Sequence, residues 1–142
     1  MLAGLFALVI AAAFSGAAFY INFAEHPARM RLPVEASLDQ WRPSYKRGFM
    51  LQATLAVAGG ALAIWQWHAT GGGLWLAGGL VLLANWPFTL LVIMPTNRRL
   101  LAEGAGTAAD TPDLLIRWNR LHAVRTLLGL LATALLFTGA RG

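Results

Sequence analysis

The chain has 142 residues, of which 58% are hydrophobic and 12% are charged, and its formal net charge at pH 7 is +5. Soluble domains carry about a quarter charged residues, so the composition excludes an ordinary soluble domain and predicts one small membrane domain. The absence of cysteine excludes disulfide bonds, thiolate metal sites and a thiol nucleophile.

Four apolar segments follow one another along the chain, and a helix needs about 20 such residues to cross the hydrocarbon core of a bilayer. We place the helices at about residues 2–24, 49–67, 74–94 and 113–138. Each apolar run is continuous rather than alternating, and a helix satisfies its own backbone hydrogen bonds in lipid. The expected fold is therefore all-α, a single integral membrane domain that forms a four-helix bundle, and no internal repeat is evident.

The first apolar segment ends in an unusual group of polar residues. Residues 2–21 carry no charge, and Pro27 is expected to end the helix a few residues later. In between, Asn22, Glu25 and His26 are spaced i, i+3 and i+4, so they share one helix face. No basic residue precedes the apolar run, so we expect a retained membrane span rather than a cleaved signal peptide.

Basic residues gather in two of the polar connections between the segments. They are Arg29, Arg31, Arg42, Lys46 and Arg47 in the first connection and Arg98, Arg99, Arg117 and Arg120 in the third. Lysine and arginine collect in cytoplasmic loops, which predicts a multi-pass protein of the cell (inner) membrane with both termini on the non-cytoplasmic side. This clustering favours the headgroups of the lipid bilayer, and not nucleic acid, as the partner of the positive charge.

The fourth segment begins with a second polar stripe. Trp118, His122 and Arg125 are spaced i, i+4 and i+7, which places them on one helix face. Asn97 follows the third segment, so three segments bring polar groups to one level of the bundle. An arginine inside a spanning helix is costly unless it is paired, and Glu25 is its expected partner. The pattern predicts a polar pocket that opens toward the cytoplasm.

Each of these residues also has a structural interpretation, and two kinds of cofactor remain open. Asn22 is typical of a hydrogen bond between neighbouring helices, and Glu25 with Arg125 is typical of an ion pair that locks a bundle. Glu25, His26 and His122 supply the two histidines and one carboxylate of a non-haem iron site, although adjacent helical residues point about 100° apart. His26 and His122 are also a pair that haem iron accepts.

Four motifs together resemble a known family. They are "NFAEHPAR" (22–29), "WRPSYKRG" (41–48), "NWPFTLLVIMPTNRRL" (85–100) and "RWNRLHAVRT" (117–126). On these motifs the chain resembles, from about residue 14 to residue 133, the anthrone-oxygenase-like family of small four-helix membrane proteins, whose bacterial members mostly have no assigned activity. The best-known relatives are fungal enzymes that oxidise a polyketide anthrone to an anthraquinone with O2 and without a bound cofactor.

The resemblance implies an O2-dependent oxidation of a lipophilic phenolic or anthrone-type compound with no cofactor. In this interpretation His122 is the general base that removes a proton from the substrate, and Arg125 stabilises the resulting phenolate. Glu25 orients His122 or His26. The residues expected to hold the substrate or stack on it are Asn22, Asn97, Asn119, Trp118 and Trp86.

Two other functional classes fit the same residues. One is a non-enzymatic membrane subunit whose polar pocket binds a quinone, a lipid or a partner protein, within a homo-oligomer or a larger membrane complex. The other is a redox protein that depends on a metal or on haem. The resemblance favours the oxygenase over both.

Overall fold

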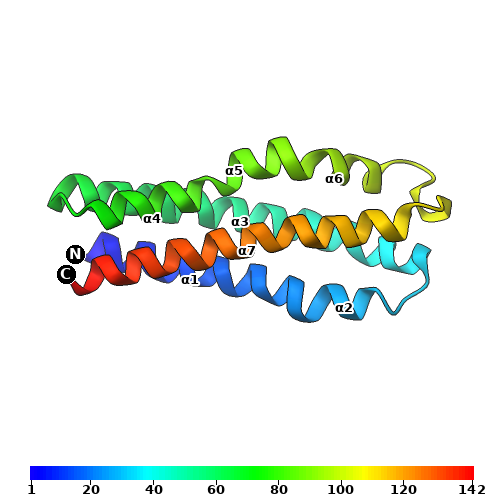
Figure 1. Cartoon of the computed structure of the whole chain (residues 1–142), viewed down its shortest axis with the longest axis horizontal. Helices are drawn as coiled ribbons and strands as arrows, with labels where there is room; N and C mark the ends of the chain where they lie inside the picture. The colour runs from blue at the N-terminus through cyan, green and yellow to red at the C-terminus, as the bar shows by residue number, and fades with distance from the viewer.

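The computed structural model describes all residues from 1 to 142, and every regular element in it is helical (Figure 1). The elements form four rods. The first rod is α1 (Leu2–Tyr20), the π-helical turn η1 (Ile21–Glu25) and α2 (His26–Arg29), and the second rod is α3 (Val34–Thr70). The third is α4 (Gly73–Leu83), α5 (Asn85–Phe88), the π-helical turn η2 (Thr89–Ile93) and α6 (Met94–Leu101). The short 3-10 turn η3 (Ala105–Thr107) leads to the fourth rod, α7 (Thr111–Arg141).

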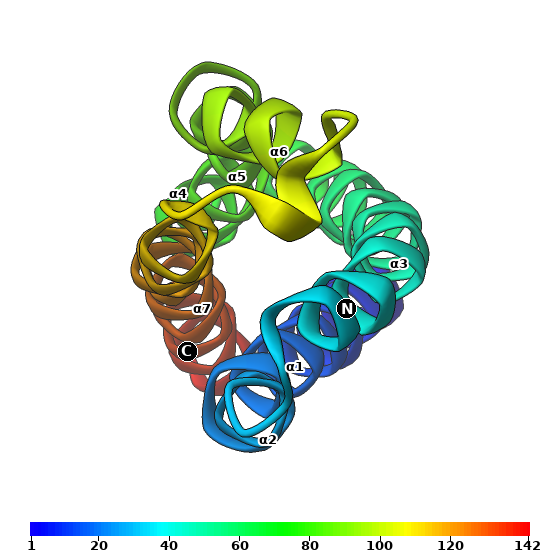
Figure 2. The same ribbon diagram turned by 90° about the vertical axis from the view of Figure 1, so that its right-hand side faces the viewer.

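All four rods are long and apolar enough to cross a membrane, which confirms the predicted all-α four-helix membrane fold. The rods form a ring in which α1 and α4 each pack against both α3 and α7 (Figure 2). Both termini lie at one end of the bundle, and the connections α2–α3 and α6–α7 lie at the other (Figure 1). We call the second end the loop end.

Small residues allow the rods to approach closely, as is usual between membrane helices. A Cβ atom built on Gly78 of α4 would lie 2.6 Å from Leu136 of α7, and one on Gly60 of α3 would lie 2.5 Å from Leu83 of α4. In the half of the bundle near the termini, these glycines therefore bring α4 into close contact with α3 and α7.

Replacing Gly78 with leucine is expected to lower the melting temperature of the protein in detergent micelles. Overpacking costs roughly 1–3 kcal/mol, and the new side chain would meet Leu136 and the backbone oxygen of Ala132. Gly16→Leu is the matched control, because nothing lies within 4 Å of a Cβ atom at that position. Equal melting temperatures for the two variants would contradict the close approach of α4 and α7.

The helices extend well beyond the apolar segments from which they were predicted. α3 has 37 residues and begins at Val34 rather than near residue 49. At 1.5 Å per residue this length is about 55 Å, which exceeds a hydrocarbon core of about 30 Å. Hydropathy identifies only the apolar part of a helix. The polar part of α3 at the loop end was therefore predicted to be a connection between helices.

The expectation that Pro27 ends the first helix was wrong, because the rod continues through Pro27 to Arg29. Two π-helical turns each end two residues before a proline: η1 ends before Pro27 and η2 before Pro95. A proline has no N–H to donate to the carbonyl four residues earlier, and a wider turn accommodates the loss. π-helical turns are frequent at functional sites, and these two lie at the same level of the bundle.

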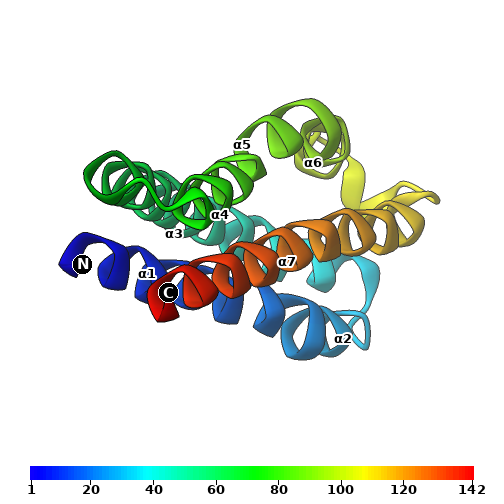
Figure 3. The same cartoon turned by 60° about the vertical axis from the view of Figure 1, so that its left-hand side comes forward.

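The third rod bends where α4 gives way to α5, so that α5 and α6 leave the direction of α4 (Figure 3). Pro87 lies just after this point and explains the bend, since proline removes a backbone hydrogen bond from the helix. Asn85 donates from its Nδ2 to the carbonyl of Leu82 at 3.0 Å, which supplies a donor to the interrupted helix.

The two halves of the chain share a local pattern that the sequence alone did not make evident. In each half of the chain, the first of the two rods contains a π-helical turn followed by a proline. The second of the two rods contains a tryptophan and, one helical turn later, another aromatic ring. Trp41 stacks on Tyr45 at 4.8 Å, Trp118 stacks on His122 at 5.1 Å, and the two indoles meet edge to face at 5.7 Å. The shared positions are too few to be recognised as a sequence repeat.

Candidate active site

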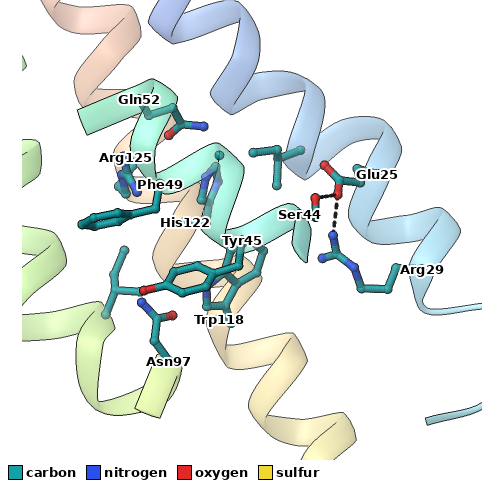
Figure 4. A pocket seen from close by; sticks show the side chains of 13 residues that line it. Glu25, Arg29, Ser44, Tyr45, Phe49, Gln52, Asn97, Trp118, His122 and Arg125 are labelled. Atoms are coloured by element: carbon teal, nitrogen blue, oxygen red, sulfur yellow. Dashed lines mark hydrogen bonds and ion pairs between the residues drawn. The ribbon is translucent and has the colours of Figure 1, made fainter. Parts of the chain in front are cut away.

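A pocket lies where η1, α3, α7 and the junction of η2 with α6 converge (Figure 4). Its polar lining includes Glu25, Tyr45, Gln52, Asn97, His122 and Arg125, and Trp118 forms part of its wall. It lies at the level where the apolar parts of the rods give way to their polar continuations. The enclosed free space is about 20 Å³, which is room for roughly one water molecule.

His122 is held in one orientation by Asn22. Its Nδ1 lies 3.1 Å from Asn22 Oδ1, which also accepts a hydrogen bond from the Thr126 hydroxyl at 2.6 Å. The amide nitrogen of Asn22 donates to the backbone oxygen of Asn119 at 3.0 Å and to its side-chain oxygen at 2.7 Å. Because the oxygen of Asn22 can only accept, Nδ1 of His122 carries the proton, and Nε2 has a free lone pair.

Asn22 and Asn119 were expected to hold substrate oxygens, but neither lines the pocket. The hydrogen bonds to His122, Thr126 and Asn119 instead occupy both ends of the Asn22 amide. The sequence placed Asn22 and His122 at the same level, but it gave no sign that the two side chains bond to each other.

Arg125 is a buried cation without a partner. Its relative exposure is 7%, it takes part in no hydrogen bond or ion pair, and its Nε is sealed from solvent. The guanidinium lies over the Phe14 ring, whose centroid is 5.7 Å from Arg125 Cζ. A buried charge with no counterion is costly, which makes this guanidinium a candidate binding site for an anion.

Glu25 was the expected partner of Arg125, and this expectation was wrong. Its Oε1 accepts hydrogen bonds from Arg29 at 2.7 Å and from the hydroxyl of Ser44 (Figure 4). It also accepts one from Gln40 at 3.0 Å. The π-helical turn alters the direction in which Glu25 points, and the early start of α3 brings Gln40 and Ser44 to meet it. These partners were missed because their segment was interpreted as a connection.

His26 is buried behind the pocket wall and does not line the pocket. Its ring lies 6.3 Å from that of Trp118, which in turn stacks on His122. Glu25, His26 and His122 do not form a cluster, and no group of three histidine, cysteine, aspartate or glutamate side chains is placed to hold a metal ion. The geometry therefore does not fit the three-ligand iron site considered from the sequence.

Tyr45 and Gln52 line the pocket beside Asn97 but were not predicted from the sequence. Gln52 and Asn97 are 1% and 0% exposed; the Gln52 side-chain oxygen and both polar atoms of the Asn97 amide lack a partner. The Tyr45 hydroxyl points toward Asn97 (Figure 4). Of these, only Asn97 was predicted. Gln52 lies inside an apolar spanning segment, and a polar residue there is itself a signal of function.

Trp86 was expected to stack on the substrate, but it does not line this pocket. Its indole nitrogen donates to the carbonyl of Ala53 at 3.3 Å, and its ring meets Phe49 edge to face at 6.3 Å. The Trp86 and Phe49 rings cover a small second cavity, beside Asn85 and Arg125. Trp86 therefore closes the α5 side of the site.

Comparison with known proteins gives a consistent result. Residues 41–135 match the sequence profile of the family described as anthrone oxygenase. The chain is 30% identical over 140 residues to an anthrone oxygenase of Claviceps purpurea, a match that covers 88% of this chain and 80% of that protein. It is 30% identical over 148 residues to the anthrone oxygenase dmxR16 of a Cryptosporiopsis species, with 94% and 85% covered. It is 29% identical over 121 residues to the anthrone oxygenase ptaC of Pestalotiopsis fici, with 71% and 82% covered. No solved structure matches.

Proposed function

The chain belongs to the anthrone oxygenase family, and from this premise we propose that it is a membrane-embedded oxygenase that converts a lipophilic phenolic anthrone to the corresponding quinone with O2. The observation that carries the proposal is the pairing of a histidine with a free Nε2 and an unpartnered buried arginine on one turn of α7. A base and a cation in one enclosed pocket suit a reaction that passes through an anion.

The reaction begins with the methylene group of the anthrone. Nε2 of His122 takes one proton from this carbon, and the charge spreads to a phenolate oxygen that the Arg125 guanidinium holds. The anion gives one electron to O2, and the radical pair combines to form a carbon–oxygen bond. The peroxide takes the proton back from His122. Loss of the second methylene proton and cleavage of the O–O bond release water, so that CH2 and O2 become C=O and H2O.

The remaining side chains position the reacting groups. Asn22 holds His122 in the tautomer that leaves Nε2 free, and Trp118 offers a flat face against which a ring stacks. The unpaired amides of Asn97 and Gln52 lie in the pocket wall and are suited to the oxygens on the edges of the substrate. No metal or haem is needed in this scheme, because the substrate anion itself reduces O2.

The placement in the cell is part of the proposal. The Lys- and Arg-rich connections at the loop end favour a cytoplasmic loop end, with both termini on the opposite side of the cell membrane. The bilayer then is both the partner of the helices and the reservoir of the lipophilic substrate.

Oxygen consumption by the purified protein tests the proposed function directly. With a dihydroxyanthrone as substrate, we expect O2 uptake well above the rate of autoxidation in a blank without protein, with one quinone formed per O2 consumed. An uptake rate equal to that of the blank would contradict oxygenase activity on this class of compound and would favour a binding role for the pocket.

A further inference from the structure

The pocket as it stands has room for roughly one water molecule, so a three-ring substrate must widen some part of its wall to enter. We propose that the substrate enters sideways from the membrane through an opening between η1 and α3, which we call the portal. Gly48 lies at the narrowest part of this portal. The identity of the ligand in this inference rests on the proposed function, whereas the route itself does not.

An open groove of about 460 Å³ runs along the outside of the bundle between η1 and α3. Ile21, Glu25, Ser44 and Gly48 line both this groove and the enclosed pocket. The two spaces are therefore adjacent and are separated only by these residues.

Aromatic rings, some buried and some half-buried, lie along the other sides of the pocket. Toward the loop end, Trp41 is fully buried and is stacked with Tyr45 and edge to face with Trp118. Toward α5, Phe49 and Trp86 meet edge to face. The side between η1 and α3 has no ring across it and is closed by the hydrogen bonds of Gln40 and Ser44 to Glu25.

Residue 48 is the place where a side chain would close the gap. Gly48 presents only backbone there, and a Cβ atom at this position would touch nothing closer than Ile21 Cδ1, at 3.9 Å. Alanine therefore fits without displacing a neighbour, whereas a larger side chain extends into the passage. None of the five residues of η1 is buried, and the contacts between η1 and α3 at this point are the hydrogen bonds of Gln40 and Ser44 to Glu25. Opening the portal therefore requires these two hydrogen bonds to break while Asn22 keeps η1 attached to α7.

The chemistry of the groove suits an amphiphilic molecule. Ile21 and Leu51 form its apolar part, and Leu51 is 55% exposed on the outside of the bundle. Gln40 and Arg47 form its polar part, toward the loop end. A flat aromatic ligand with phenolic oxygens on one edge matches both parts when it lies at the boundary between hydrocarbon and headgroups.

Binding kinetics show whether residue 48 lies in a portal or in the wall of the binding pocket. Narrowing a portal slows ligand association and dissociation by the same factor, so the dissociation constant does not change. We would follow saturable quenching of tryptophan fluorescence by a dihydroxyanthraquinone in lipid nanodiscs, using Trp118→Phe to identify the signal that comes from the pocket. This probe requires no turnover. For Gly48→Leu we expect the association and dissociation rates both to fall roughly tenfold, with Kd within about twofold of the wild-type value.

Two controls accompany this variant. Gly48→Ala makes the same gain in helix propensity without filling the gap, and Ala61→Leu adds bulk on an exposed part of the same helix; both should bind as the wild type does. The portal is overturned if Gly48→Leu binds at the wild-type rate, if its Kd weakens while the association rate is kept, or if the wild-type protein shows no saturable quenching. Binding with these kinetics but without oxygen uptake would refute the proposed oxygenase and leave the portal standing.

Discussion

His122→Gln is expected to lower kcat for anthrone oxidation by a factor of about 10²–10⁴, the usual contribution of a positioned general base. Glutamine keeps a polar group that can bond to the Asn22 amide, but it has no basic nitrogen to accept the proton of the substrate. KM should change little, because the imidazole acts mainly in the transition state. Steady-state oxygen uptake gives both constants.

A matched control is available at the opposite end of the bundle. His68 is exposed on the last turn of α3, far from the pocket along the chain and in space, so His68→Gln should retain wild-type kcat. Retention of activity in His122→Gln, with the same helix content and melting temperature as the wild type, would remove His122 from the role of base. Loss of activity in both variants would point to a general defect instead.

Much of the fold and part of the site could be predicted because they follow from regular periodicity. Continuous apolar runs identified the four spanning rods, and the helical spacing of Trp118, His122 and Arg125 placed all three on the face that lines the pocket. A regular α-helix allows such an inference, because each residue has a fixed direction relative to its neighbours.

The inference failed where the helix is not regular or where a residue's partner comes from a distant rod. The π-helical turn η1 shifts the face on which Glu25 lies, and Glu25 therefore binds Arg29 and α3 rather than Arg125. The hydrogen bond between Asn22 and His122 joins residues 100 positions apart in the chain. The spacing of residues within one helix cannot predict such a contact between two helices. Gln52 differs from both, since its polarity within an apolar span was visible in the sequence.

Arg125→Gln is expected to lower kcat/KM by a factor of about 10²–10³, comparable to the loss of one group that stabilises a developing oxyanion. The same substitution should leave the melting temperature unchanged or raise it. Arg125 has no counterion and no hydrogen bond to lose, and a neutral side chain relieves the burial of an unpaired charge.

These opposite directions distinguish a binding role for Arg125 from a structural one. An arginine that held the helices together would lose stability and activity together when replaced. Arg141→Gln supplies the control, because Arg141 is exposed at the end of α7, where it lies over the Phe137 ring at 5.8 Å and makes no ion pair. Neither the kinetics nor the melting temperature of this variant should change. A marked fall in the melting temperature of Arg125→Gln would show that the guanidinium stabilises the bundle and would contradict its assignment as the anion site. A gain in stability with a loss of activity would instead mean that the buried charge of Arg125 lowers the stability of the bundle and is needed to bind the substrate anion.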